Sequence, residues 1–242
     1  MSAQMPERYT SGLDSSSDLA YREIKSLILM GEAPIGVQLG ERRIAERLSV
    51  SRTPVREALL RLYAEGFLDR HPDGGYRVNH PTGRSTREFY ELRKALELYA
   101  VRSTVQRLAA GELESDSGRL LELRSEWDAL ELEAPELDPD FVLVDEDFHR
   151  RLAEATGNTE LVEDLRRICE RIRPVRTHDF VLPGRIKATI AQHLQILDAV
   201  LDGDAGAEGL LERHISESQQ FVEAAVGSVL ERMLNQRPEG GL

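Results

Sequence analysis

Apolar residues recur every three or four positions through the first third of the chain, and this spacing predicts three short helices. The helices are expected from Asp18 to about Gly31, over residues 41–48, and from Thr53 to Gly66. Asp18 suits the N-cap of the first helix. Thr53 and Pro54 suit the start of the third, since threonine caps helices and proline fits the first turn. Residues 34–40 and 49–51 are expected to form turns.

Two short extended segments follow, at residues 67–71 and 76–79. The sequence between them, Pro72–Asp73–Gly74–Gly75, is typical of a hairpin turn. Three helices followed by a hairpin is the order of a winged helix-turn-helix domain, which we place at residues 18–80. Residues 1–17 are polar and rich in serine, so they are expected to form a disordered arm.

Only helical periodicity continues after a linker expected at residues 81–84. A capping box, Ser85–Thr86–Arg87–Glu88, is expected to open a second domain at residues 85–233, with a tail at 234–242. About six helices are expected there, the first marked by Leu92, Leu96, Tyr99 and Val105 and the fourth ended by Pro174. Helices of this length pack as an antiparallel bundle. The expected fold class is therefore mostly α, with an N-terminal winged helix-turn-helix followed by an all-helical antiparallel bundle.

The charge of the chain is unevenly distributed. The net charge is −12, and all of it falls after residue 83, because acidic and basic residues balance before that point. Arginines gather at positions 42, 43, 47, 52, 56 and 61. Charges act on phosphates only over a Debye length of about 8 Å in the cell, so this local basic segment can contact DNA in an acidic protein. A solvated helix face is the alternative interpretation of the same segment.

The hydropathy and the cysteine content of the chain exclude other classes of protein. No apolar run is long enough to span a membrane, and the N-terminus lacks the apolar segment of a secretory signal, so a cytoplasmic protein without a membrane partner is expected. The single cysteine, Cys169, has no partner for an internal disulfide and is expected in the core.

The start of the third helix carries the side chains that suit DNA recognition. A recognition helix directs its N-terminal turn at the bases, and arginine bridges two acceptors of guanine. Arg52 and Arg56 lie four residues apart and suit that role. The hydroxyl groups and free backbone N–H groups of this turn suit phosphates. The candidate DNA-binding residues are Arg42, Ser51, Arg52, Thr53, Pro54, Arg56 and the hairpin residue Gly74. From periodicity alone, a winged helix that docks a protein is equally open.

Three segments carry a resemblance to a known family. GERRIAERL, SRTPVREAL and RLYAEGFL, within residues 18–80, resemble the GntR superfamily of bacterial repressors. The resemblance implies a DNA-binding winged helix. It further implies that Arg42, Arg52, Thr53, Arg56 and the wing tip at Gly74 occupy the positions that contact operator DNA.

Histidines in the second domain suggest a metal site. Asp145 and His149 are four residues apart on one helix, and His193 and His214 lie within the apolar stripes of two others. A hydrogen-bonded core histidine is the simpler interpretation for any one of them. Three histidines on three helices, with a carboxylate beside one, suit zinc, nickel or manganese. His178 follows the expected helix break and is left out of this set.

The second domain also resembles a known family. VDEDFHRRLAEATGNTEL, AQHLQILDAVLDGD and LERHISES resemble the FCD-type effector domain of FadR-type GntR regulators, over residues 86–230. The resemblance implies a metal held by Asp145, His149, His193 and His214. It also implies a small carboxylate effector, with Arg93 as an inward arginine. A salt bridge from Arg93 to Glu97 is the alternative.

Together these features predict a repressor that acts as a homodimer on double-stranded operator DNA and is released by a small organic acid. A metal sensor, in which the metal itself is the effector, uses the same residues. A metal-dependent hydrolase or lyase is a third possibility, but the sequence has no HExxH helix, nucleophile elbow or P-loop, so no enzyme is expected.

Overall fold

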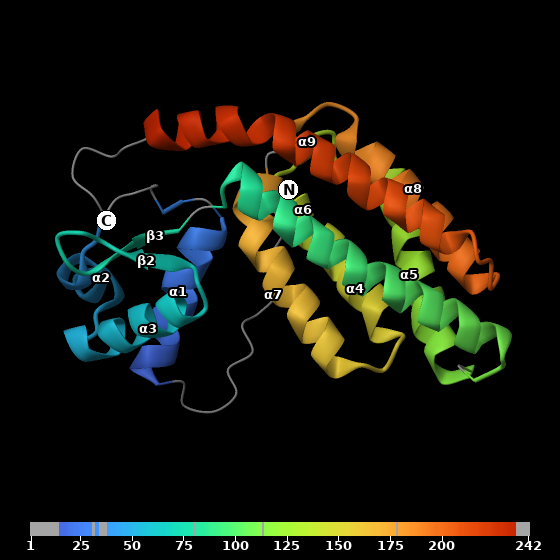
Figure 1. Cartoon of the computed structure of the whole chain (residues 1–242), viewed down its shortest axis with the longest axis horizontal. Coiled ribbons are helices and arrows are strands. Elements are labelled where there is room, and N and C mark those ends of the chain that lie inside the picture. The colour runs from blue at the N-terminus through green and yellow to red at the C-terminus, as the bar shows by residue number, and fades with distance from the viewer. Residues whose placement is uncertain are drawn as a thin grey trace. The chain divides into compact units, whose positions relative to one another are not determined.

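The computed structural model describes residues 15–30, 32–33, 38–79, 81–112, 114–177 and 179–235 (Figure 1). Most of the expected arm, residues 34–37 of the expected turn, His178 and residues 236–242 of the expected tail lie outside these ranges. The described chain forms two compact units, which divide after Asn79. We call them the winged unit and the helical unit.

The winged unit contains three helices and three short strands. In chain order they are α1 (Ser16–Leu29), β1 (Gln38–Leu39), α2 (Glu41–Leu48), α3 (Arg52–Ala64), β2 (Leu68–Arg70) and β3 (Tyr76–Val78). α1 packs along α3, and Ile28, Leu59 and Leu62 are almost fully buried between the elements. This core holds the outer faces of α2 and α3 toward solvent.

The strands form an antiparallel sheet in the order β1-β3-β2. Leu68 pairs with Val78, and Gln38 pairs with Arg77. A turn was expected over residues 34–40, but Gln38 and Leu39 form strand β1. The sequence does not reveal this strand, because two residues are too few to display an alternating pattern. The hairpin between β2 and β3 turns at Gly74 and Gly75, whose φ angles of +92° and +73° favour glycine.

Two helix starts in the winged unit differ from expectation. Ser15, rather than Asp18, caps α1, and its hydroxyl accepts a hydrogen bond from the Asp18 N–H at 3.1 Å. Helix α3 begins one residue before Thr53, with Ser51 in the N-cap position. Serine and aspartate are both good caps, so a cluster of them leaves the starting residue open until the chain is folded.

The helical unit contains long helices and one short 3-10 turn. They are α4 (Gly83–Ala109), α5 (Glu114–Glu133), α6 (Phe141–Glu154), α7 (Thr159–Arg176), η1 (Asp179–Val181), α8 (Arg185–Leu201) and α9 (Ala207–Asn235). α4 packs against α9 and α7, α5 against α8, and α6 against α7 (Figure 1). The expected fold class is confirmed. Within the described ranges, no helix has the length and apolar character needed to cross a membrane.

Helix α4 departs from expectation in its start and its buried face. It begins at Gly83, inside the expected linker, and Thr82 and Ser85 form the capping box. Leu92 and Tyr99, which marked the expected apolar stripe, are each 53% exposed. The buried face instead carries Arg93 and Glu97. Hydropathy assigns charged side chains to the surface, so it cannot recognise a buried ion pair.

Helix α7 continues past the proline that was expected to end it. Pro174 lies inside the helix, which runs on to Arg176. The Thr177 N–H still donates to the Arg173 carbonyl at 3.1 Å. The extra residues matter, because they place Arg176 in the interior of the helical unit, where it is 1% exposed.

Candidate functional site

Four side chains meet at a single point inside the helical unit. Asp145 and His149 come from α6, His193 from α8 and His214 from α9, and each is at most 2% exposed. One potential ligand atom from each lies within 4.8 Å of all the others. The structure thus brings together all four residues that the sequence singled out as metal ligands.

The ring nitrogens are close enough to share one ion. His214 Nε2 lies 3.1 Å from His193 Nε2 and 3.3 Å from His149 Nε2. Asp145 carboxylate oxygens lie 3.6 Å from His149 Nε2 and 3.7 Å from His193 Nε2. Metal–nitrogen bonds of about 2.0–2.1 Å separate neighbouring ligand nitrogens by about 3.0–3.4 Å. The spacing therefore fits a divalent transition metal.

Hydrogen bonds at Nδ1 of His149 and His214 bear on whether the site binds a cation or is a set of hydrogen-bonded core histidines, and they favour the cation. His149 Nδ1 lies 2.5 Å from Glu97 Oε2, and His214 Nδ1 lies 2.8 Å from Gln192 Oε1. Both partners are acceptors, so each Nδ1 carries the hydrogen and each Nε2 of a neutral ring carries a lone pair. When both rings are neutral, these two lone pairs face each other across 3.3 Å, an arrangement that a bound cation stabilises.

The third ring is fixed by packing. His193 stacks on Phe148, with ring centroids 3.6 Å apart and an angle of 6° between the planes, and its edge meets Trp127. Its Nδ1 has no hydrogen-bond partner among the described residues. The stacking therefore directs Nε2 of His193 at the other ligands.

Electrostatics keep the site in its metal-binding protonation state. Burial, followed by repulsion from a neighbouring histidine, holds the pKa values of His193 and His214 well below the usual range. Burial raises the pKa of Asp145, but Arg176 and then His149 outweigh it and hold that pKa well below its usual range. His193 and His214 are therefore neutral and Asp145 is ionised, which are the forms of these groups that ligate metals.

Arg93 lies in the same interior. Its Nε donates to Glu97 Oε1 at 2.5 Å, so the salt bridge considered from the sequence is present and fully buried. Its Nη1 and Nη2 have no hydrogen-bond partner within the described part of the chain. Burial raises the pKa of Glu97, but Arg93 and then His149 lower it to about 2. Glu97 thus contacts both the candidate effector residue and a candidate metal ligand.

Several neighbours of this site were not among the residues predicted from the sequence. Arg176 donates through Nη2 to Asp145 Oδ2, and Arg185 and Asp179 are also buried close by. Tyr90 Oη and Ser218 Oγ are hydrogen-bonded at 3.0 Å. Arg185 offered one signal, since it lies eight residues before His193 and hence on a similar side of α8. Arg176 offered none, because it follows a proline that was predicted to end its helix.

The candidate DNA-binding residues lie on the surface of the winged unit. Ser51, Arg52, Thr53 and Arg56 are exposed at the start of α3, beside the half-buried Pro54. Arg56 Nε pairs with Glu41 Oε2 at 2.7 Å, and Arg42 Nε lies 3.8 Å from Glu46 Oε1. Gly74 is exposed at the hairpin tip. The fold thus places the arginine at the start of α3, its hydroxyl neighbours and the hairpin tip on the solvent side.

Comparison with known proteins identifies the class. Residues 17–78 match the family described as bacterial regulatory proteins, gntR family, and residues 88–217 match the FCD domain. The chain therefore belongs to the GntR family of bacterial transcriptional regulators and carries an FCD domain. This confirms the resemblance noted in both halves of the sequence. The family that matches residues 17–78 is described as regulatory proteins.

Individual relatives agree with the family. The chain is 33% identical to the Nta operon transcriptional regulator of Aminobacter aminovorans, over 81% of this chain and 91% of that protein. It is 30% identical to the HTH-type transcriptional repressor RspR of Escherichia coli strain K12, over 77% of this chain and 80% of that protein. The fold resembles the solved structure of E. coli McbR/YncC, with a TM-score of 0.68 and 23% identity, over 88% of this chain and 99% of that one.

Proposed function

We propose that this regulator represses transcription and is released from its operator when a small carboxylate metabolite binds at a metal-lined pocket in the helical unit. The observation that carries the proposal is Arg93. This buried guanidinium has two nitrogens without a partner among the described residues, and it shares Glu97 with His149. A guanidinium with free N–H groups is well matched to a carboxylate, which accepts two parallel hydrogen bonds.

The metal is proposed to be zinc, with nickel or manganese as alternatives, held by Asp145, His149, His193 and His214. Three imidazoles and one carboxylate leave room for a ligand from the effector. The metal would supply a positive charge that orients a carboxylate, while Arg93 would bind the same molecule through its free nitrogens.

DNA recognition is proposed for the exposed start of α3. Arg52 and Arg56 would reach base edges, while Ser51, Thr53 and the N–H groups beside Pro54 would meet phosphates. Arg42 and the hairpin tip at Gly74 would contact the flanking backbone. The basic residues lie in the winged unit and the acidic excess in the rest of the chain, so approach through this face is favoured.

A homodimer on a pseudo-palindromic operator is proposed as the active form, working in the cytoplasm where the chromosome lies. Leu92 and Tyr99 support a partner chain, because they are seven residues apart on α4, share one side of the helix and are each 53% exposed. Repression is supported by the relative from Escherichia coli strain K12, whose name describes a transcriptional repressor.

The test is a titration of the full-length, zinc-loaded protein on DNA from its own promoter region, followed by fluorescence anisotropy. Acetate, lactate, malate and gluconate are the probes. At least one of them is expected to weaken DNA binding by about 5–150-fold, the usual range of allosteric coupling. Arg93→Gln is expected to bind DNA normally and lose the response, whereas Arg102→Gln, an exposed arginine on the same helix, is expected to keep it.

Two outcomes would overturn the proposal. Weak binding that does not depend on DNA sequence would exclude an operator-specific regulator. A change in DNA affinity on adding zinc or chelator alone, with no response to any carboxylate, would instead identify a metal sensor.

A further inference from the structure

The interior of the helical unit contains an unusual number of buried charges. Three arginines (Arg93, Arg176 and Arg185) face three carboxylates (Glu97, Asp145 and Asp179) within the same polar interior. A fourth buried carboxylate, Glu170, is compensated separately by Arg166 at 2.5 Å. The protein's own buried charges around the site therefore balance.

A divalent metal at the four ligands disturbs this balance. The three histidines are neutral ligands, and the charge of Asp145 is already matched by Arg176. The ion thus adds two positive charges that no described side chain in this interior offsets. Uncompensated buried charge is costly, so a bound ligand with two negative charges is favoured over one with a single charge.

The unused hydrogen-bond donors lead to the same conclusion. Among the described residues, no hydrogen-bond partner is found for Arg93 Nη1 and Nη2, Arg176 Nε and Nη1, or Arg185 Nε, although Arg176 Nη1 lies 3.9 Å from Glu146 Oε1. These nitrogens come from three different helices, α4, α7 and α8. One carboxylate group accepts a bidentate pair from one guanidinium, so a single carboxylate leaves donors of the other arginines unmatched.

Hydroxyl groups lie on the same helix faces. Thr189 is four residues from both Arg185 and His193 on α8, and Thr86 is seven residues before Arg93 on α4. Both Oγ1 atoms are buried without a hydrogen-bond partner in the part of the chain that the structure describes. They suit a ligand that carries a hydroxyl group.

We infer that the effector is a dicarboxylate, with a hydroxyl group between its two carboxylates, rather than a monocarboxylic acid. One carboxylate would lie at the metal and Arg93, and the second at Arg185 and at Nε of Arg176. This inference rests on the proposed function and narrows the effector class that it names.

Matched pairs of ligands test the inference by calorimetry on the full-length, zinc-loaded protein. L-malate differs from L-lactate by a second carboxylate, and glucarate differs from gluconate in the same way. The dicarboxylate of at least one pair is expected to bind at least about tenfold more tightly. Equal or tighter binding of the monocarboxylate in both pairs would overturn the inference and leave the proposed function standing. If no member of either pair binds, the inference fails, and the proposed function is then decided by the DNA titration, whose probes also include acetate.

A variant tests the role of the second arginine. Arg185→Gln is expected to remove the preference for the dicarboxylate while retaining zinc and monocarboxylate binding. Lys187→Gln, an exposed position on the same helix with the same change of charge, is expected to keep the full preference. Zinc content and melting temperature establish that both variants are folded. A preference unchanged in Arg185→Gln would contradict the assignment.

Inorganic phosphate tests whether binding depends only on two negative charges or also on two separate carboxylates in the ligand. It is largely a dianion near neutral pH, but it carries both charges on one compact group and cannot offer two separate carboxylates. Phosphate is expected to compete with malate only weakly, and competition at equal concentration would show that a compact dianion, rather than a dicarboxylate, is the preferred ligand.

Discussion

His149 Nδ1 lies 2.5 Å from Glu97 Oε2, although the two residues are 52 positions apart and belong to different helices. The other oxygen of the same carboxylate accepts a hydrogen bond from Arg93 at 2.5 Å. A single carboxylate on α4 therefore orients a candidate metal ligand and a candidate effector residue together. Metal binding and effector binding are coupled through this contact in the proposed mechanism.

Glu97→Gln is expected to weaken zinc binding by about 10–100-fold, the usual effect of losing a carboxylate that supports a ligating histidine. The amide retains the shape of the side chain but not the charge that makes His149 a stronger ligand. Competition against a chromophoric chelator measures the change. Glu91→Gln, an exposed glutamate on the same helix, is the control. Equal zinc affinity in the two variants would argue against a supporting role for Glu97.

Asp145→Asn is expected to abolish stabilisation by zinc. A ligand at about a thousand times its dissociation constant adds about 4 kcal/mol to the free energy of unfolding, because it binds only the folded state. Calorimetric melting with zinc and with chelator measures this increment. Asp147→Asn, two residues away and half exposed, is expected to keep it. An increment that survives in Asp145→Asn would remove Asp145 from the ligand set.

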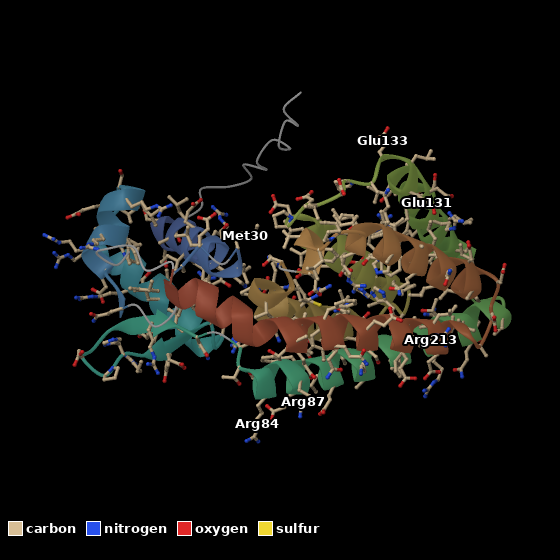
Figure 2. All side chains as sticks on the ribbon, turned by 90° about the horizontal axis from the view of Figure 1, so that it is seen from above. Met30, Arg84, Arg87, Glu131, Glu133 and Arg213 are labelled. Carbon is tan, nitrogen blue, oxygen red and sulfur yellow. The ribbon has the colours of Figure 1, made fainter. Side chains whose placement is uncertain are left out.

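Arg52→Ala is expected to reduce operator affinity by about 10–100-fold, because a bidentate contact to guanine contributes about 1–3 kcal/mol. The effect should be smaller on DNA of unrelated sequence at the same salt concentration. Arg213→Ala is the matched control, since this arginine projects outward from α9 in the helical unit (Figure 2). Loss of affinity that is equal on specific and unrelated DNA would assign Arg52 to a phosphate instead.

Asp179→Asn is expected to stabilise the metal-free protein at pH 7 but not at pH 3.5. Burial raises the pKa of Asp179 to about 6, although Arg176 and Arg185 oppose the shift. Folding therefore favours the protonated form. The contribution of this protonated carboxyl to the stability of the folded state is complete below the ordinary pKa of 3.8 and is lost as the pH rises through about 6. The cost of ionisation that asparagine avoids is about 3 kcal/mol at most.

Urea unfolding at several pH values tests this expectation. Asp202→Asn, at an exposed position just after α8, serves as the control and is expected to show no gain that depends on pH. A constant difference between Asp179→Asn and the wild type from pH 3.5 to pH 7 would contradict the raised pKa.

Much of the fold could be predicted because apolar spacing reports which side of an isolated helix becomes buried. Val55, Ala58, Leu59 and Leu62 were assigned correctly in this way. The same logic failed on α4, where Leu92 and Tyr99 are exposed and Arg93 and Glu97 are buried. The spacing of Arg93 and Glu97 allows them to pair with each other, but it does not reveal that the pair is buried. Burial depends on groups from other helices, such as His149, and spacing along one helix carries no information about those groups.

The sequence by itself determined the order of elements, the basic start of α3 and the identity of the four candidate metal ligands, because each depends on local spacing and on residue chemistry. Only the tertiary structure decided what surrounds those ligands. Glu97, Arg176 and Arg185 come from three helices and face the site through the packing of the whole unit. The charge balance that points to a dicarboxylate exists only after folding, because water screens these groups in the unfolded chain and burial leaves them to one another.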